Sequence, residues 1–231
     1  MIDHSLLSPA LSADELEAGI DVALAYDVAS VCIMPYALKR CAERLSGSGV
    51  MPSTTIGFPH GGHATAVKRA EAIQAIDDGC QELDMVVNIS QAKSGAWDYV
   101  QNDIAAVVTV AHDAGRKVKV IFENCYLTDE EKIALCRICS EVNADWVKTS
   151  TGYGTGGATH EDLKLMRAHA APHVQVKAAG GVRDFDALLA VRALGVTRCG
   201  ASRTQAMLDE CRQRLSLPPI AIASAAPSQG Y

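Results

Sequence analysis

The sequence lacks a basic excess of charge, a long apolar run and a recognisable secretory leader. Its 231 residues carry 21 Lys and Arg against 27 Asp and Glu, a formal net charge of −6. Sequence-independent binding to nucleic acid or to an anionic membrane surface needs a basic footprint, so this balance argues against both kinds of partner. Any anionic ligand must therefore be attracted by a local site.

Apolar runs are also too short for a membrane protein. None of them reaches the roughly 18 residues that a transmembrane helix requires. The opening segment MIDHSLLSPALSADELEAG carries acidic side chains where a signal peptide needs a basic start and an apolar block. We therefore expect a cytoplasmic protein without a membrane partner.

Eight cysteines are scattered along a chain that is long enough to bury its own core, which favours reduced thiols over a disulfide framework. Cys136 and Cys139 form a C-x-x-C motif in a segment with helical periodicity, but no second ligand pair lies at a zinc-like spacing. His4, His60 and His63 lie at two different strand ends without a matching carboxylate pattern. We expect two buried thiols and no metal site.

The dominant positive feature is a repeat. Eight short runs of apolar or β-branched residues end in small or polar residues. They begin near residues 2, 29, 52, 82, 118, 145, 175 and 197. Segments with helical spacing lie between them, and several open on Ser, Thr or Asp and close on Gly. Strand and helix alternating eight times, about every thirty residues, predict an α/β fold of the (β/α)8 TIM-barrel type in a single domain. A doubly wound open sheet is the alternative.

The barrel domain is expected over residues 1–215. Residues 216–231 are rich in Pro, Ala and Ser, which predicts a mobile C-terminal tail. A barrel places its active-site groups at the carboxyl ends of its strands. The residues collected there are Asp3, Cys32, Gly57, Asp84 to Asn88, Glu123, Lys148 to Ser150, Lys177 to Gly181 and Gly200 to Ser202.

Two lysines on neighbouring predicted strands suggest carbonyl chemistry. Lys148 in WVKTS and Lys177 in QVKAAGG both alternate onto the strand face that we expect to line the barrel. An unperturbed lysine has a pKa of about 10.4 and is almost fully protonated at neutral pH. Burial and a neighbouring cation both lower that pKa, and the resulting neutral amine forms a Schiff base with a carbonyl substrate.

Asp84 in ELDMVVN shares a strand face with Glu82. A carboxylate that faces a barrel interior needs a cationic partner, which the two lysines supply. The same carboxylate can shuttle protons through water once an imine has formed. The alternative is purely structural and pairs the lysines with Asp84 and Glu123.

Two segments of small residues predict a phosphate site. Gly180 and Gly181 follow the seventh strand, and Gly200, Ala201 and Ser202 follow the eighth, each before a helical segment. Small residues there let a phosphate approach backbone N–H groups and a helix N-terminus, at the usual phosphate position of barrels. Ordinary turn glycines are the alternative interpretation.

Three further features receive other interpretations. The segment GYGTGG over residues 152–157 matches G-x-G-x-x-G, but it follows the sixth strand and no acidic residue lies about twenty positions later, so we reject a dinucleotide site. Cys32 is either a thiol reactive toward aldehydes or a buried structural residue. Lys68 and Glu71 in VKRAEAI are expected to form an exposed pair on a helix.

Several segments together resemble the deoxyribose-phosphate aldolase family. They are IDHSLL, ASVCIMP, IGFPHG, ELDMVVN, KVIFE, VKTSTG, VKAAGGVR and GAS, which span nearly the whole chain. The resemblance implies a class I lyase that reversibly cleaves 2-deoxyribose 5-phosphate to glyceraldehyde 3-phosphate and acetaldehyde. It also implies a role in deoxyribonucleotide catabolism, no metal or organic cofactor, and a homo-oligomer.

The same resemblance implies residue roles. Lys148 is the Schiff-base nucleophile, Lys177 lowers its pKa, and Asp84 serves the proton relay. Tyr231 at the chain end is implied to reach the site from the tail. The residues implied to hold the substrate phosphate are Gly180, Gly181, Gly200, Ala201 and Ser202.

The sequence departs from the family pattern at the phosphate end. Tyr153 stands where some members carry a lysine after STG, and Arg203 stands where a small residue often follows the GAS serine. Arg203 is either the replacement phosphate-binding cation or a solvent-exposed side chain. The alternative functions are a related Schiff-base aldolase with another acceptor aldehyde, and a sugar-phosphate isomerase or epimerase that uses carboxylates or cysteines.

Overall fold

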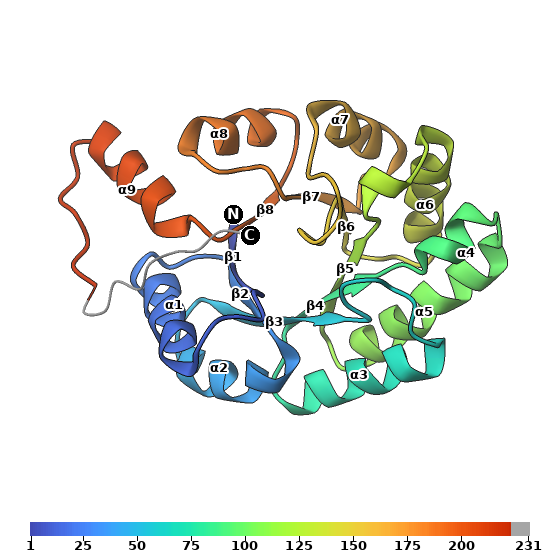
Figure 1. Cartoon of the computed structure of the whole chain (residues 1–231), viewed down its shortest axis with the longest axis horizontal. Helices are drawn as coiled ribbons and strands as arrows, with labels where there is room; N and C mark the ends of the chain where they lie inside the picture. The colour runs from blue at the N-terminus through green and yellow to red at the C-terminus, as the bar shows by residue number, and fades with distance from the viewer. Residues whose placement is uncertain (223–231) are drawn as a thin grey trace.

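The computed structural model describes residues 1–222 and contains a closed barrel of eight parallel strands ringed by helices (Figure 1). The strands pair in chain order, and β8 pairs with β1 to close the barrel. Their bounds are β1 Ile2–Leu6, β2 Ser30–Ile33, β3 Met51–Ile56, β4 Glu82–Val86, β5 Lys117–Ile121, β6 Trp146–Lys148, β7 Gln175–Ala179 and β8 Arg198–Ala201. The predicted (β/α)8 barrel is confirmed, and each strand begins within one residue of its predicted start.

Helices cover the outside of the barrel. Their bounds are α1 Ala13–Ala25, α2 Leu38–Leu45, α3 Thr65–Asp77, α4 Ile89–Lys93, α5 Trp97–Asp113, α6 Asp129–Glu141, α7 His160–His169, α8 Phe185–Ala193 and α9 Thr204–Arg214. Periodicity does not identify α2, α4 and α9. The first two are short, and α9 buries only Thr204 and Met207, too narrow a stripe to stand out in the sequence. Within residues 1–222, no helix is long and apolar enough to cross a membrane.

Capping side chains define where two of these helices begin. Ser12 and Thr128 each accept a hydrogen bond from the backbone N–H three residues later. Glu15 and Glu131 return the interaction by accepting from the backbone N–H of the cap residue. These capping boxes stabilise the points at which the chain leaves a loop and enters α1 and α6.

Below a layer of Ser5, Thr55, Ile121 and Ala179, inward-facing positions form three further layers of four, each layer supplied by alternate strands. The upper layer of these three, toward the carboxyl ends of the strands, is Cys32, Asp84, Lys148 and Gly200. The middle layer is Asp3, Ser53, Lys119 and Lys177, and the lower layer is Ser30, Glu82, Trp146 and Arg198. Barrels usually fill such layers with Val, Ile and Leu. Here the apolar core occupies the shell between strands and helices instead, which leaves the interior for charged groups.

The C-x-x-C cysteines are buried thiols, as expected. Cys136 and Cys139 are fully buried on α6, and the Cys136 thiol donates to the Met166 carbonyl oxygen at 3.9 Å. Burial raises the pKa of the Cys136 thiol to about 12. All eight cysteines lie within residues 1–222 and are free thiols there, which agrees with the reduced state expected from the sequence.

The expected surface pair of Lys68 and Glu71 is wrong. Lys68 is fully buried, and its Nζ donates to Asp103 Oδ2 at 2.5 Å and to the Val86 carbonyl oxygen at 2.9 Å. Glu71 accepts instead from the Gly57 N–H at 2.7 Å. The packing of α3 against α5 produces this arrangement, because it covers a helix face that the sequence pattern marks as polar.

The chain after α9 has neither helix nor strand through residue 222. Since α9 ends at Arg214, the predicted boundary at residue 215 lies next to the last element of the barrel. The mobility of residues 216–231 stays a prediction, and Tyr231 lies outside the described residues.

Candidate active site

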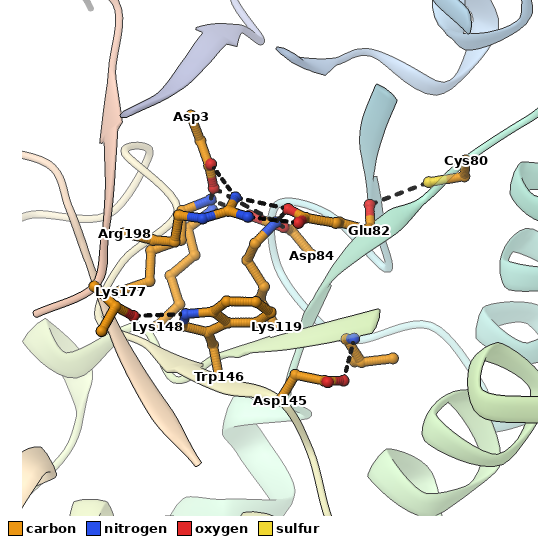
Figure 2. Close-up of polar contacts among 12 residues, drawn as sticks. Asp3, Cys80, Glu82, Asp84, Lys119, Asp145, Trp146, Lys148, Lys177 and Arg198 are labelled. Carbon is orange, nitrogen blue, oxygen red and sulfur yellow. Dashed lines mark hydrogen bonds and ion pairs between the residues drawn. The ribbon is translucent and has the colours of Figure 1, made fainter. Parts of the chain in front are cut away.

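Two lysines and one aspartate meet inside the barrel. Lys148 from β6 and Lys177 from β7 both donate to the same oxygen, Asp84 Oδ2 from β4, at 2.8 and 2.7 Å (Figure 2). All three residues are at least 97% buried. The lysines are direct register partners on adjacent strands, so both ammonium groups point into the barrel as the alternation predicts.

Glu123 is not a partner of these lysines, contrary to the structural alternative. It accepts hydrogen bonds from the Thr151 backbone N–H at 3.1 Å and from the Thr151 hydroxyl. The backbone at Glu123 has a φ of 58°, where β5 passes into a short 3₁₀ turn. Its carboxylate therefore stabilises the loop after β6 rather than the lysine pair.

Lys119 from β5 and Asp3 from β1 extend the cluster, although neither was singled out as a catalytic candidate. Lys119 Nζ lies 2.9 Å from Asp84 Oδ1 and 3.4 Å from Asp3 Oδ2. Lys177 Nζ lies 2.6 Å from the same oxygen of Asp3. The alternation of Lys117 and Lys119 in KVKVI is the sequence signal for an inward lysine, but that signal also fits a polar strand edge when the register is unknown.

Burial and neighbouring charges give the lysines different pKa values. Burial lowers the pKa of Lys148, Lys177 adds to this effect, and Asp84 opposes both. Burial acts in the same direction on Lys177, but Asp3 and Asp84 outweigh it and raise the pKa of Lys177. The pKa of Lys119 is raised well above its ordinary value because three carboxylates outweigh burial. Lys148 is therefore the lysine of this cluster that most readily becomes a neutral amine.

A cavity of about 340 Å³ opens at the carboxyl ends of the strands, and Lys148 and Lys177 form part of its lining. The predicted phosphate segments after β7 and β8 also line it, together with one arginine. These lining residues are Gly180, Gly181, Arg183, Gly200, Ala201 and Ser202. The amine and the small-residue segments thus face one common space.

The loop after β6 forms a wall of the same cavity, a role that the sequence does not reveal. Residues 154–157 line the cavity. A Cβ on Gly157 would lie 2.6 Å from the backbone C and O of Gly180, so these two loops touch only because position 157 lacks a side chain. The Ala158 N–H, shared between two acceptors, donates to Ala179 O at 3.1 Å and to Gly180 O at 3.0 Å. Close packing against the loop after β7 therefore explains Gly157 of this motif.

The remaining candidates occupy different surroundings. Cys32 is buried and lines the cavity, and burial raises the pKa of its thiol. Its burial fits the structural interpretation, and its place in the cavity lining fits the reactive one. Tyr153 donates its hydroxyl proton to the Leu7 carbonyl oxygen at 2.7 Å and packs edge-on against Phe58. Arg203 is exposed at the N-cap of α9, whereas the cavity lining contains Arg183.

Comparison with known proteins decides the family. Residues 1–202 match the family model described as DeoC/LacD family aldolase. The chain is a member of this aldolase family. It is 67% identical over 231 residues to the deoxyribose-phosphate aldolase of Rhodopirellula baltica, an alignment that covers 100% of this chain and 95% of that protein. The family resemblance seen in the sequence is confirmed.

Solved aldolase structures share the fold of this family member. An aldolase called QR15 has 34% sequence identity and a TM-score of 0.88, over 93% of this chain and 95% of that one. The deoxyribose phosphate aldolase of Aeropyrum pernix, described as a unique tetramer, has 28% identity and a TM-score of 0.85, over 92% of this chain and 90% of that one. The barrel and its topology are therefore those of aldolases.

Proposed function

We propose that this chain is a deoxyribose-phosphate aldolase that reversibly cleaves 2-deoxyribose 5-phosphate to glyceraldehyde 3-phosphate and acetaldehyde, with Lys148 as the imine-forming residue. Membership of the aldolase family and the name of the 67% identical relative support this substrate. The observation that carries the mechanism is a buried lysine of lowered pKa that lines a cavity walled by small residues. The tetrameric relative supports a homo-oligomeric assembly as part of the proposal.

The bond changes follow from imine chemistry. The Lys148 amine attacks the aldehyde carbon of the open-chain sugar, and loss of water leaves a protonated imine. The electron pair of the C2–C3 bond then moves toward the imine nitrogen while the C3 hydroxyl gives up its proton, which releases glyceraldehyde 3-phosphate and leaves an enamine. Protonation of the enamine carbon and hydrolysis of the imine release acetaldehyde and restore the amine.

Asp84 suits the charge that develops in these steps. Its Oδ2 lies 2.8 Å from Lys148 Nζ, so a carboxylate faces the nitrogen that becomes a cation. Lys119, Lys148 and Lys177 outweigh burial and hold the pKa of Asp84 well below its ordinary value. The group therefore stays ionised and stabilises the cation that forms at the Lys148 nitrogen. The water-mediated proton relay at Asp84 that the family resemblance implies is part of the proposal.

The small residues after β7 and β8 suit the phosphate of the substrate. Gly180 and Gly181 have φ values of 74° and 86°, a backbone conformation that glycine adopts without strain. Close approach to such a backbone exposes N–H groups to an anion. Arg183 lies in the cavity lining and supplies a cation there, a position that Arg203 at the N-cap of α9 does not share.

Trapping with acetaldehyde and cyanoborohydride tests the mechanism. We expect one reduced adduct per chain, which peptide mass mapping places on Lys148, because among the amines of residues 1–222 this one combines a lowered pKa with a place in the cavity lining. Lys148→Ala should give no adduct and no detectable cleavage of 2-deoxyribose 5-phosphate. Exposed Lys164 on α7 provides the control, since Lys164→Ala should behave as the wild type. An adduct confined to Lys119 or Lys177 would contradict the assignment.

A further inference from the structure

The lower layer of the barrel carries charged groups that lie outside the cavity lining. Arg198, the first residue of β8, forms a two-pronged ion pair with Glu82, the first residue of β4, at 2.8 and 2.6 Å (Figure 2). Arg198 also donates to Asp3 Oδ1 at 2.5 Å, and its guanidinium lies 5.1 Å from the centre of the Trp146 ring. We call Glu82, Trp146 and Arg198 the barrel floor.

Two unbroken chains of ion pairs connect Arg198 with Lys148. The first passes in order through Asp3, Lys177 and Asp84. The second passes in order through Glu82, Lys119 and Asp84. The successive N···O distances along both chains run from 2.5 to 2.9 Å. The barrel floor thus influences the charge on Lys148 through these ion pairs, although no floor residue contacts Lys148 directly.

The number of charges in this network is informative because its members are almost cut off from solvent. It contains three carboxylates and, apart from Lys148, three cations. These are Asp3, Glu82 and Asp84, and Lys119, Lys177 and Arg198. The network is electrically neutral when Lys148 is an amine and carries one positive charge when Lys148 is protonated. An uncompensated charge is costly in a buried site, so this count favours the amine, and loss of either charge of the Arg198–Glu82 pair would upset it.

Other titratable groups around the network do not change this count near neutral pH. Burial raises the pKa of the Cys32 thiol, and it raises the pKa values of Cys80 and Cys199 to about 12. All three thiols are therefore uncharged. The remaining neighbours are Lys117, which lies over the Trp146 ring and is exposed to solvent, and the half-buried amino group of Met1, whose pKa is lowered by burial and by Arg198.

We propose that Arg198 and Glu82 are positioning residues for the aldol reaction, whose opposite charges balance the buried network so that Lys148 is its uncharged amine. Neither side chain belongs to the cavity lining, so both act through Asp3, Lys119 and Asp84 rather than on the substrate. This role rests on the proposed imine chemistry at Lys148. It assigns a function to the end of the barrel opposite the cavity.

The test measures the rate of acetaldehyde trapping on Lys148 as a function of pH. The acid-side midpoint of that profile reports the proton on Lys148. Arg198→Met removes a positive charge and should raise the midpoint by about one unit, while Glu82→Gln removes a negative charge and should lower it by about one unit. The double variant restores neutrality and should return the midpoint to the wild-type value. A purely structural pair would instead move both single variants in the same direction.

Matched controls separate charge from packing. Arg214 on α9 also pairs with a carboxylate in two-pronged fashion, with Asp186 at 2.6 and 2.8 Å, and lies 5.2 Å from the Phe185 ring centre. Arg214→Met should therefore leave the midpoint unchanged. Arg198→Lys keeps the charge and should keep the midpoint near the wild-type value.

If Arg198→Met alone does not fold, Glu82→Gln can be compared with the double variant instead. These two proteins also differ only by the positive charge of Arg198. Replacing both members of a buried pair is tolerated better than removing one. Equal midpoints in the wild type, Glu82→Gln and the double variant, with the adduct still on Lys148, would overturn the floor proposal. Absence of the adduct from the wild type would overturn the proposed function instead.

Discussion

At the residue scale, the three buried lysines differ in how many carboxylates each one contacts. Lys119 contacts three carboxylates, and Lys177 contacts Asp3 and Asp84. Lys148 contacts Asp84 alone. Each nearby carboxylate favours the ammonium form, so among equally buried lysines the one with a single partner loses its proton first. In the proposed mechanism, the same residue type thus supplies a nucleophile at one position and counter-ions at two others.

Lys177→Leu tests this argument. Lys177 lowers the pKa of Lys148, so removing it should raise that pKa and move the acid limb of the pH–activity profile upward by about one unit. The measurement is kcat for cleavage of 2-deoxyribose 5-phosphate across the pH range, with Lys164→Leu on the exposed face of α7 as the matched control. An optimum that stays at the wild-type pH, or falls, would contradict an electrostatic role for Lys177.

At the element scale, the sequence predicts the strands and their inward faces because side chains alternate with a period of two. It does not predict which inward residues meet. Lys148 and Lys177 are register partners, whereas Asp84 reaches them from β4 only because the sheet closes into a barrel. The burial of Lys68 has a related cause: a polar pair three residues apart predicts an exposed helix face, but here α5 packs over that face and Asp103 accepts from Lys68. Arg203 was ambiguous because α9, whose N-cap it forms, lacks a clear apolar stripe.

The contact between the loops after β6 and β7 gives a prediction at this scale. Gly157→Ala places a Cβ 2.6 Å from the backbone of Gly180, and backbone atoms cannot yield as a flexible side chain does. The phosphate segment should shift, and KM for 2-deoxyribose 5-phosphate should rise about tenfold or more. Trapping of acetaldehyde on Lys148 should change little, because this substrate has no phosphate.

Gly62→Ala is the control for that substitution. A Cβ at Gly62 meets no atom within 4 Å, so this variant should keep the wild-type KM. Steady-state kinetics on both variants makes the comparison. If Gly157→Ala slowed acetaldehyde trapping as much as it weakened sugar-phosphate binding, the loop contact would serve the amine rather than the phosphate segment.

At the scale of the whole molecule, apolar burial and chemistry occupy different layers. The apolar core fills the shell between strands and helices, and this shell supplies the hydrophobic stabilisation of the fold. The barrel interior instead holds a network of ion pairs, which is weak evidence for stability because desolvation offsets the attraction between charges. The overall charge of −6 therefore says little about the site, where lysines and two arginines, Arg183 and Arg198, line or underlie the cavity.

Because the interior network is buried and charged, the free energy of unfolding of the whole molecule should depend on pH in the acid range. Asp84 has a folded-state pKa well below 3.8, its ordinary value, because neighbouring lysines outweigh burial. A carboxylate of this kind contributes stability that is complete above its unfolded-state pKa and is lost as the pH falls toward the folded-state value. The free energy of unfolding in urea should therefore decrease steadily below about pH 4. In Asp84→Asn that decrease should be smaller, whereas Asp113→Asn, exposed at the end of α5, should keep the wild-type slope. Equal slopes in all three proteins would show that the interior network does not govern acid unfolding.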